Sequence, residues 1–178
     1  MSRNVEIKAV LRDRDAIIAA AARRSDSVPE IISQHDFFFR CGEGRLKLRM
    51  FEPACGELIQ YDREDIASAR CSRYQVAYTS TPEILLDILT RTLGRTGEVK
   101  KTRILFKIGQ TRVHIDTVEG LGDFLELEVV LRPEQTEADG KRIAETLLAE
   151  LGAEKSQFVA EEYVDLLSGS NFRMDSAG

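Results

Sequence analysis

Charged and apolar residues alternate along several short segments of this chain. Near its start, Glu6 and Lys8 alternate with Val5, Ile7 and Ala9. Because successive side chains of a β-strand point to opposite faces, the two charged residues share one face and the apolar residues share the other. The same design recurs in four later segments, which are 45–49, 101–103, 112–116 and 126–128. Charge on one face of so many strands favours a fold in which these faces line a polar interior.

The same patterning predicts about eight strands and four helices. We expect strands near residues 3–11, 33–40, 45–51, 57–63, 71–79, 97–108, 111–118 and 124–131. We expect helices over residues 13–24, 82–93, 134–151 and 161–167. Thr81 and Pro82 provide an N-cap and a first helical residue for the second helix. Turn residues at 41–44, 52–56 and 109–110 favour hairpins between antiparallel neighbours.

Each predicted helix must bury an apolar stripe, and the apolar faces of the strands are the available surface. If the sheet closes into a barrel with helices outside it, the charged faces point inward. An open sheet with a hydrated charged face satisfies the same pattern, so the alternation leaves both arrangements open. We expect one α+β domain over residues 1–167, because no linker interrupts it. The small, polar residues 168–178 predict a disordered tail.

The overall charge argues against a protein that coats nucleic acid. The chain has 25 Lys and Arg against 30 Asp and Glu, a formal net charge of −5, whereas such proteins carry a basic excess. The two signs are nevertheless segregated. Residues 95–114 hold six Lys or Arg and one acid, and residues 115–128 hold five acids with no Lys or Arg. This segregation indicates that charge has a specific use in the second half of the chain.

Cysteine usage and hydropathy point to a reducing, aqueous compartment. Cys41, Cys55 and Cys71 are odd in number and lack zinc-ligand spacing. No apolar signal region is present near the N-terminus, and the longest run of small apolar residues, 16–22, is too short to cross a bilayer. We therefore expect a cytoplasmic protein without a membrane partner.

The order of the charged segments resembles the CYTH superfamily of triphosphate tunnel metalloenzymes. This superfamily includes class IV adenylyl cyclases, thiamine triphosphatases and inorganic triphosphatases. Its E-x-E-x-K signature falls on Asn4-x-Glu6-x-Lys8, and its R-x-K-x-R pattern falls on residues 45–49. Further segments that look like the family are 58–63, 122–128 and 162–167. The resemblance covers about residues 3–167, and the shared order of the motifs is more specific than any one of them.

The resemblance implies a closed eight-stranded antiparallel β-barrel whose lumen holds a triphosphate and Mg²⁺ or Mn²⁺. By this resemblance the metal ligands are Glu6, Asp116, Glu126 and Glu128. The residues that it assigns to the triphosphate are Arg45, Lys47, Arg49, Arg63, Lys101, Arg103 and Arg112. Catalytic roles fall on Lys8, Arg63 and Arg103. The chemistry is consistent, because a triphosphate with about four negative charges needs several cations, and Mg²⁺ prefers carboxylate and phosphate oxygens.

One residue departs from the family pattern. Asn4 stands where the family has its first glutamate, and an amide supplies one neutral oxygen without charge. A second metal site would therefore be weaker. His35 and His114 are expected to act as space fillers or hydrogen-bond partners rather than as ligands. Tyr61 and Tyr163 are expected to be structural, with orientation of a lysine or contact with substrate as the alternative for either.

The leading functional hypothesis is a metal-dependent enzyme that hydrolyses a small-molecule triphosphate. A class IV adenylyl cyclase is the alternative, because the segments 126–130 and 162–167 look closer to the cyclase branch. A non-catalytic module that binds polyphosphate or nucleotide is a second alternative, motivated by Asn4. An α+β protein with merely exposed charge is a third. The organic group of the substrate and the formation of a homodimer are left open.

Overall fold

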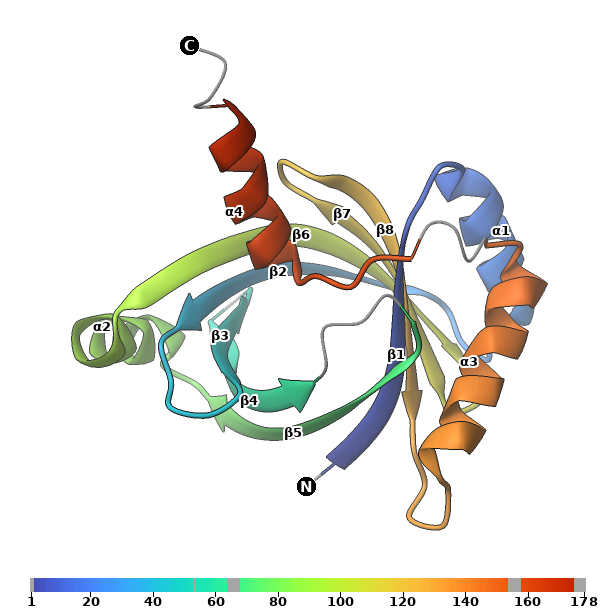
Figure 1. Cartoon of the computed structure of the whole chain (residues 1–178), viewed down its shortest axis with the longest axis horizontal. Coiled ribbons are helices and arrows are strands. Elements are labelled where there is room, and N and C mark those ends of the chain that lie inside the picture. Colours follow the sequence, from blue (N-terminus) through green and yellow to red (C-terminus); the bar gives the residue numbers. More distant parts are fainter. Residues whose placement is uncertain (1, 53, 64–67, 154–157, 175–178) are drawn as a thin grey trace.

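The structure is a computed structural model that describes residues 2–52, 54–63, 68–153 and 158–174. Eight strands and four helices lie within these residues (Figure 1). The strands are β1 (Ser2–Val10), β2 (Glu30–Phe39), β3 (Arg45–Phe51), β4 (Cys55–Arg63), β5 (Arg70–Thr79), β6 (Arg95–Ile108), β7 (Thr111–Val118) and β8 (Gly122–Val130). The helices are α1 (Arg14–Arg24), α2 (Pro82–Leu93), α3 (Glu137–Leu151) and α4 (Tyr163–Met174). The predicted number and order of elements are confirmed, with most ends shifted by a few residues.

The eight strands form one closed barrel in the order β1-β5-β4-β3-β2-β6-β7-β8. Every pairing is antiparallel, and β1 closes the barrel between β5 and β8. The expected closed barrel of the α+β class is therefore confirmed. Consecutive strands within residues 30–79, and consecutive strands within residues 95–130, pair with each other as hairpins. The pairing of β2 with β6 joins these two runs, and β1 joins their other ends.

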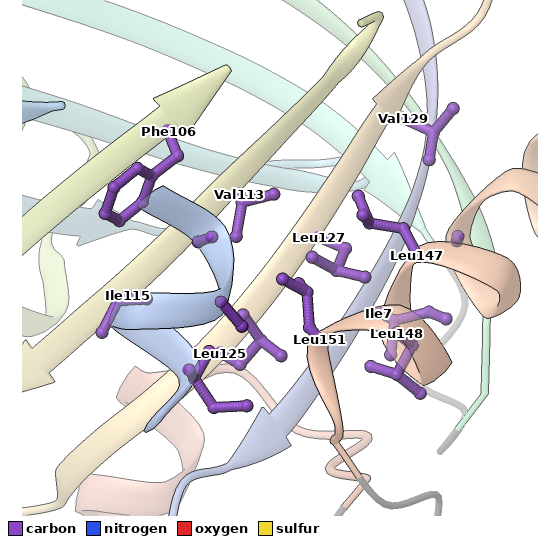
Figure 2. Packing of buried hydrophobic residues seen from close by; sticks show 14 of the residues in the cluster. Ile7, Phe106, Val113, Ile115, Leu125, Leu127, Val129, Leu147, Leu148 and Leu151 are labelled. Atoms are coloured by element: carbon purple, nitrogen blue, oxygen red, sulfur yellow. The ribbon is translucent and has the colours of Figure 1, made fainter. Parts of the chain in front are cut away.

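Helices cover the apolar outer surface of the barrel. On one side, α1 and α3 pack against strands that include β1, β7 and β8. Figure 2 shows Leu147, Leu148 and Leu151 of α3 beside Ile7 and Leu127 of the sheet. On the opposite side, α2 packs against β2, β3 and β4 (Figure 1). Because these apolar faces are covered from outside, the alternating charged residues point into the barrel.

Local sequence signals fix the ends of these helices. Thr81 is the N-cap of α2 and Pro82 its first residue, as predicted, although the Thr81 side chain makes no capping hydrogen bond. Thr136 caps α3 by accepting from the Asp139 backbone N–H, and the Asp139 carboxylate accepts from the Thr136 backbone N–H in return. Such reciprocal capping satisfies two backbone donors that the first turn would otherwise leave unpaired. Within the described residues, no helix combines the length and apolarity needed to cross a membrane.

The last helix is longer than the sequence predicts. The helix α4 continues to Met174, whereas a helix ending near residue 167 and a disordered tail were expected. The domain boundary predicted after residue 167 therefore falls inside a helix, and residues 175–178 lie outside the described residues. Tyr163 and Val164 at the start of α4 are buried against Phe38, Val99 and Phe124, which point inward near one end of the barrel. The helix thus stands over that end (Figure 1).

Candidate functional site

The inward faces of the strands surround a cavity of about 560 Å³. Nine of the predicted site residues line it, and these are Glu6, Lys8, Lys47, Arg49, Lys101, Arg103, Arg112, Glu126 and Glu128. Asp36, Glu57 and Glu162 add further charge to its wall and were not predicted. The cavity therefore brings together most of the charged segments that the alternation singled out.

The buried carboxylate of Asp36 anchors two cations on β3. Arg49 donates from Nε and Nη2 to the two carboxylate oxygens at 2.8 and 2.9 Å, and Lys47 Nζ lies 3.2 Å from Oδ2. Burial would raise the pKa of Asp36, but the charges of Arg49 and Lys47 hold it well below its ordinary value. A permanently ionised Asp36 keeps both cations in place at the cavity wall. Asp36 could not be predicted from the sequence, because β2 carries polar residues on both faces.

A second buried aspartate anchors a matching pair of cations across the β6–β7 hairpin. Arg103 donates to both oxygens of Asp116 at 2.6 and 2.7 Å, and Lys101 and the Tyr163 hydroxyl donate to Oδ2 at 3.2 and 3.1 Å. Burial would raise the pKa of Asp116, but Arg103 and Lys101 lower it. Asp116 is 0% exposed and does not line the cavity. It therefore anchors cations in this structure, and its predicted role as a metal ligand stays a prediction that rests on the family resemblance.

Three glutamates form an acidic wall on the neighbouring strands β1 and β8. Glu6 lies directly opposite Glu128 in the strand register, and Glu126 is two residues away on the same face of β8. The His114 ring sits between the two β8 carboxylates, with Nδ1 3.3 Å from Glu126 and Nε2 3.8 Å from Glu128. His114 is thus a hydrogen-bond partner, as expected. Burial would raise the pKa of Glu126, but the nearby Arg103 charge and the His114 hydrogen bond lower it.

Glu128 has two further partners, one charged and one neutral. Arg112 reaches it from β7 with Nη2 donating to Oε1 at 3.1 Å, and the Arg112 side chain stays 40% exposed. Asn4 donates from Nδ2 to the same Oε1 at 2.5 Å. Asn4 is therefore in the barrel interior as its alternation predicts. It supplies a hydrogen-bond donor to the acidic wall where the family pattern would add a carboxylate.

Lys8 is fixed by contacts with the segment that crosses the end of the barrel and leads into α4. Its ammonium donates to the Glu161 carbonyl at 3.2 Å, lies 3.9 Å from the Glu162 carboxylate and sits 4.1 Å above the Tyr163 ring. The hydroxyl of Tyr61 donates to Glu162 from β4 at 3.1 Å. Both tyrosines have side-chain contacts within the chain and also line the cavity. The Tyr163 ring additionally fixes the predicted catalytic lysine.

Arg70 is a buried residue of the site that the sequence pattern did not predict. It is 2% exposed, donates from Nε to Glu6 at 3.3 Å and donates from Nη1 to the Ala160 carbonyl at 2.8 Å. It therefore orients Glu6 and ties this carboxylate to the segment before α4. The surrounding strand reads R-C-S-R-Y-Q, with polar residues on both faces, so its pattern gave no direction for Arg70.

One predicted phosphate ligand does not line the cavity, and the side chain of another lies outside the described part of the chain. Arg45 shares the inward face of β3, but it lies beyond the cavity wall and pairs with Asp165 of α4 at 2.9 Å. The structure therefore does not bring Arg45 together with Lys47 and Arg49. Arg63 ends β4, and its side chain lies outside the described part of the chain.

Comparison with known proteins decides the family. A family model for the CYTH domain matches residues 2–163, which is nearly the whole chain. The chain belongs to the CYTH family. A search of curated proteins finds no match.

Solved structures of other proteins share this fold. The PH1012 protein of Pyrococcus horikoshii OT3 is 20% identical with a TM-score of 0.82, and the match covers 94% of this chain and 99% of that one. A candidate adenylate cyclase of Vibrio parahaemolyticus is 19% identical with a TM-score of 0.74, over 93% and 97% of the two chains. The candidate adenylyl cyclase HpAC1 of Hippeastrum, described as having a dominant triphosphatase activity, is 14% identical with a TM-score of 0.66, over 96% of each chain.

CYTH triphosphate tunnel enzymes are generally dependent on a divalent metal, and the acidic wall has suitable chemistry. Within the described residues, no group of three His, Cys, Asp or Glu side chains is placed to hold a metal ion. Mg²⁺ does not need such a group, because it usually takes one or two carboxylates and completes its shell with water and substrate phosphates. Glu6 and Glu128 are direct cross-strand partners and fit this requirement. Glu126 is the third candidate ligand.

The triphosphate affinity of this site should fall as the pH rises through about 8. Burial and the neighbouring Arg103 lower the pKa of Lys101 to about 8, so its ammonium loses a proton in this range. Losing that charge should weaken binding about tenfold or more, because a hydrogen bond to a charged group contributes about 1.5–3 kcal/mol. Calorimetry with inorganic triphosphate at pH 7 and pH 9, without divalent metal, measures the change.

The matched variants for this titration are Lys101→Gln and Lys107→Gln. Lys107 is exposed near the end of β6, does not line the cavity and pairs with Glu30, so its loss should leave the pH dependence intact. Lys101→Gln should bind weakly at both pH values with a flatter profile. An equally steep profile in the Lys101→Gln protein would show that another group titrates.

Proposed function

We propose that this chain is a divalent-metal-dependent enzyme that binds a triphosphate in the barrel lumen and hydrolyses one of its phosphoanhydride bonds. One observation supports the proposal above the others. Two buried aspartates each hold an arginine and a lysine, and these cations share one cavity with the acidic wall of Glu6, Glu126 and Glu128. A string of phosphates with its metal is a ligand that needs both kinds of surface.

The cations are positioned for phosphate before any ligand arrives. Because Asp36 and Asp116 already fix Arg49 and Arg103, binding costs these side chains little additional conformational entropy. Lys47 and Lys101 extend the two pairs, and Arg112 adds a fifth cation beside the acidic wall. Arginine offers forked donors that match phosphate oxygens, whereas lysine acts as a compact charge. Arg45 and Arg63 keep their proposed phosphate role only by family resemblance.

The reaction centre is proposed at the junction of the cations with the acidic wall. Arg103 lies 3.5 Å from Glu126, and Lys8 is the direct cross-strand partner of Glu126. Both cations can therefore reach a phosphoryl group placed against this carboxylate and stabilise the charge that develops on it. A bound Mg²⁺ or Mn²⁺ would polarise the phosphoryl oxygens and favour ionisation of the attacking water.

An apolar part of the cavity wall supports the cyclase alternative. Apolar and aromatic side chains line another part of the cavity wall, and they are Ile32, Phe51, Ile59, Val76, Tyr78 and Leu105. No residue could be assigned to a nucleotide base from the sequence alone, and this surface could accommodate a base. It favours a triphosphate that carries an organic group, which a cyclase would require. Hydrolysis of such a substrate is compatible with the same surface.

We expect phosphate release from inorganic triphosphate and from ATP, and we expect it only when Mg²⁺ or Mn²⁺ is added. Chromatographic separation of the products from ATP distinguishes the candidates, because hydrolysis gives ADP or AMP and cyclisation gives cyclic AMP with pyrophosphate. Cyclic AMP as the main product would replace hydrolysis by the cyclase alternative. Tight binding without turnover would favour a non-catalytic module.

The variant Asn4→Glu should be less stable than the parent without metal and should bind metal more tightly. The new carboxylate would lie beside Glu6 and Glu128, so repulsion and the lost Asn4–Glu128 hydrogen bond should lower the apo protein's free energy of unfolding by about 1 kcal/mol or more. With metal present the added charge should lower the Mg²⁺ concentration needed for half-maximal rate. Metal titrations of rate and of melting temperature measure both effects.

The control Asn4→Leu removes the same hydrogen bond without adding charge. It should lower the melting temperature and leave the Mg²⁺ requirement nearly as it is in the parent. If Asn4→Glu behaves like Asn4→Leu in both titrations, residue 4 does not contribute to the metal site.

A further inference from the structure

Gln34 is a buried amide inside the cavity. It lies on the inward face of β2, lines the cavity and is 5% exposed. Among the residues that the structure describes, its Oε1 is buried and has no hydrogen-bond partner. Native proteins satisfy most buried polar atoms, so an unpaired carboxamide oxygen in a functional cavity calls for a partner from outside the chain.

The position of Gln34 lies between two kinds of surface. Along β2 it is flanked on the same face by Asp36, which anchors Arg49, and by apolar Ile32. Across the sheet its direct partner on β6 is Lys101. Phe51 also lines the cavity nearby, at the end of β3, one residue beyond the pairing of Met50 with His35. Gln34 therefore marks the place where the phosphate-binding cations give way to the apolar wall.

The chemistry of a carboxamide limits what can bind there. The oxygen of Gln34 is an acceptor, so it cannot pair with ionised phosphate oxygens and needs an O–H or N–H group. Lys101 donates to Asp116 at 3.2 Å, and the structure forms no hydrogen bond between Lys101 and the Gln34 oxygen. A hydroxyl can donate to Oε1 and accept from Nε2, so it suits both halves of the amide. In a ligand with phosphates on the cations, such a hydroxyl belongs to the organic group attached to them.

We propose that Gln34 is a specificity-determining residue that binds a sugar hydroxyl of a nucleoside triphosphate. The inference rests on the proposed triphosphate-binding function and narrows its substrate class. It predicts that the cavity prefers ATP to 2′,3′-dideoxy-ATP, which carries the same phosphates and base but lacks both sugar hydroxyls. Inorganic triphosphate should not sense Gln34 through this contact.

Calorimetric binding in EDTA, where metal-dependent turnover cannot intervene, tests the assignment with three ligands. The parent should bind ATP about three- to tenfold more tightly than dideoxy-ATP, as expected for one hydrogen bond. Gln34→Met has a similar length without polar groups, and its ATP to dideoxy-ATP ratio should fall to about one. Its affinity for inorganic triphosphate should stay within about twofold of the parent. The control Gln75→Met, on the exposed outer face of β5, should keep the parental ratio.

Melting temperatures provide a second readout. Because Gln34→Met removes a buried amide with an unpaired oxygen, the variant should melt at the same temperature as the parent or higher. An unchanged ATP to dideoxy-ATP ratio in Gln34→Met would overturn the assignment and leave water as the partner of the amide. A parent that does not distinguish the two nucleotides would overturn it as well. Hydrolysis is measured separately with Mg²⁺, so a failure of the proposed activity does not obscure the binding result.

Discussion

Arg103→Ala is expected to lower the free energy of unfolding by about 3–5 kcal/mol and to abolish detectable triphosphate binding. Arg103 is 5% exposed and makes both short hydrogen bonds to Asp116. Removing it leaves a carboxylate buried in the barrel wall with Lys101 as its remaining charged partner. Urea unfolding of the apo protein gives the stability change, and calorimetry with inorganic triphosphate gives the loss of binding.

The control for this result is Arg112→Ala. Arg112 also lines the cavity and pairs with a glutamate, but 40% of its side chain is exposed. Its removal should therefore weaken triphosphate binding while changing the free energy of unfolding by less than about 1 kcal/mol. Equal losses of stability in the two variants would contradict the anchoring role given to Asp116. Normal triphosphate binding by Arg103→Ala would contradict the lumen as the binding site.

Glu128→Gln is expected to lower metal-dependent turnover by at least about 100-fold, since even indirect partners of metal ligands cost 10–100-fold when changed. The substitution removes a charge from the acidic wall but keeps the side-chain shape and an oxygen that can accept from Asn4. The fold should therefore persist, which circular dichroism and the melting temperature can verify. Rates measured across a Mg²⁺ titration separate weaker metal binding from a lower maximal rate.

Glu57→Gln provides the matched comparison. Glu57 also lines the cavity, but it lies on β4 opposite Arg49 and away from Glu6, Glu126 and Glu128. Its Mg²⁺ titration should resemble that of the parent. Full Mg²⁺-dependent turnover by Glu128→Gln would exclude Glu128 as a metal ligand, and equal losses in both variants would indicate a general charge effect.

The sequence predicted this architecture wherever one strand face was consistently charged and the other consistently apolar. The segments around Glu6, Lys47 and Glu128 meet this condition, and the family order of these segments removed the ambiguity between an open sheet and a barrel. Outer helices then cover the apolar faces, as the burial of Ile7 and Leu127 confirms. The inward direction of these charges was therefore predictable from elementary strand geometry.

Residues whose strands are polar on both faces could not be assigned in the same way. Asp36 and Gln34 alternate with Ser33 and His35, so neither face of β2 could be chosen from the pattern. Arg70 belongs to a similar strand. Asp116 presents a different difficulty, because alternation gives its face but not its depth, and its neighbours Arg103 and Lys101 fill the space that separates it from the cavity. The depth of a carboxylate in the barrel wall decides whether it reaches the cavity or pairs with a buried cation, and the strand pattern does not give that depth.

The closure of the barrel by β1 has a consequence for how the chain folds. β1 is synthesised before every other strand, yet its partners are β5 and β8. The pairing of Glu6 and Lys8 with Glu128 and Glu126 therefore has to wait until β8 has been made. Proteins dominated by such long-range pairings fold slowly, because the loss of chain entropy precedes the contacts that compensate for it. Closure of the lumen between β1 and β8 joins the first and the last strand of the barrel, so this pairing spans the longest stretch of chain.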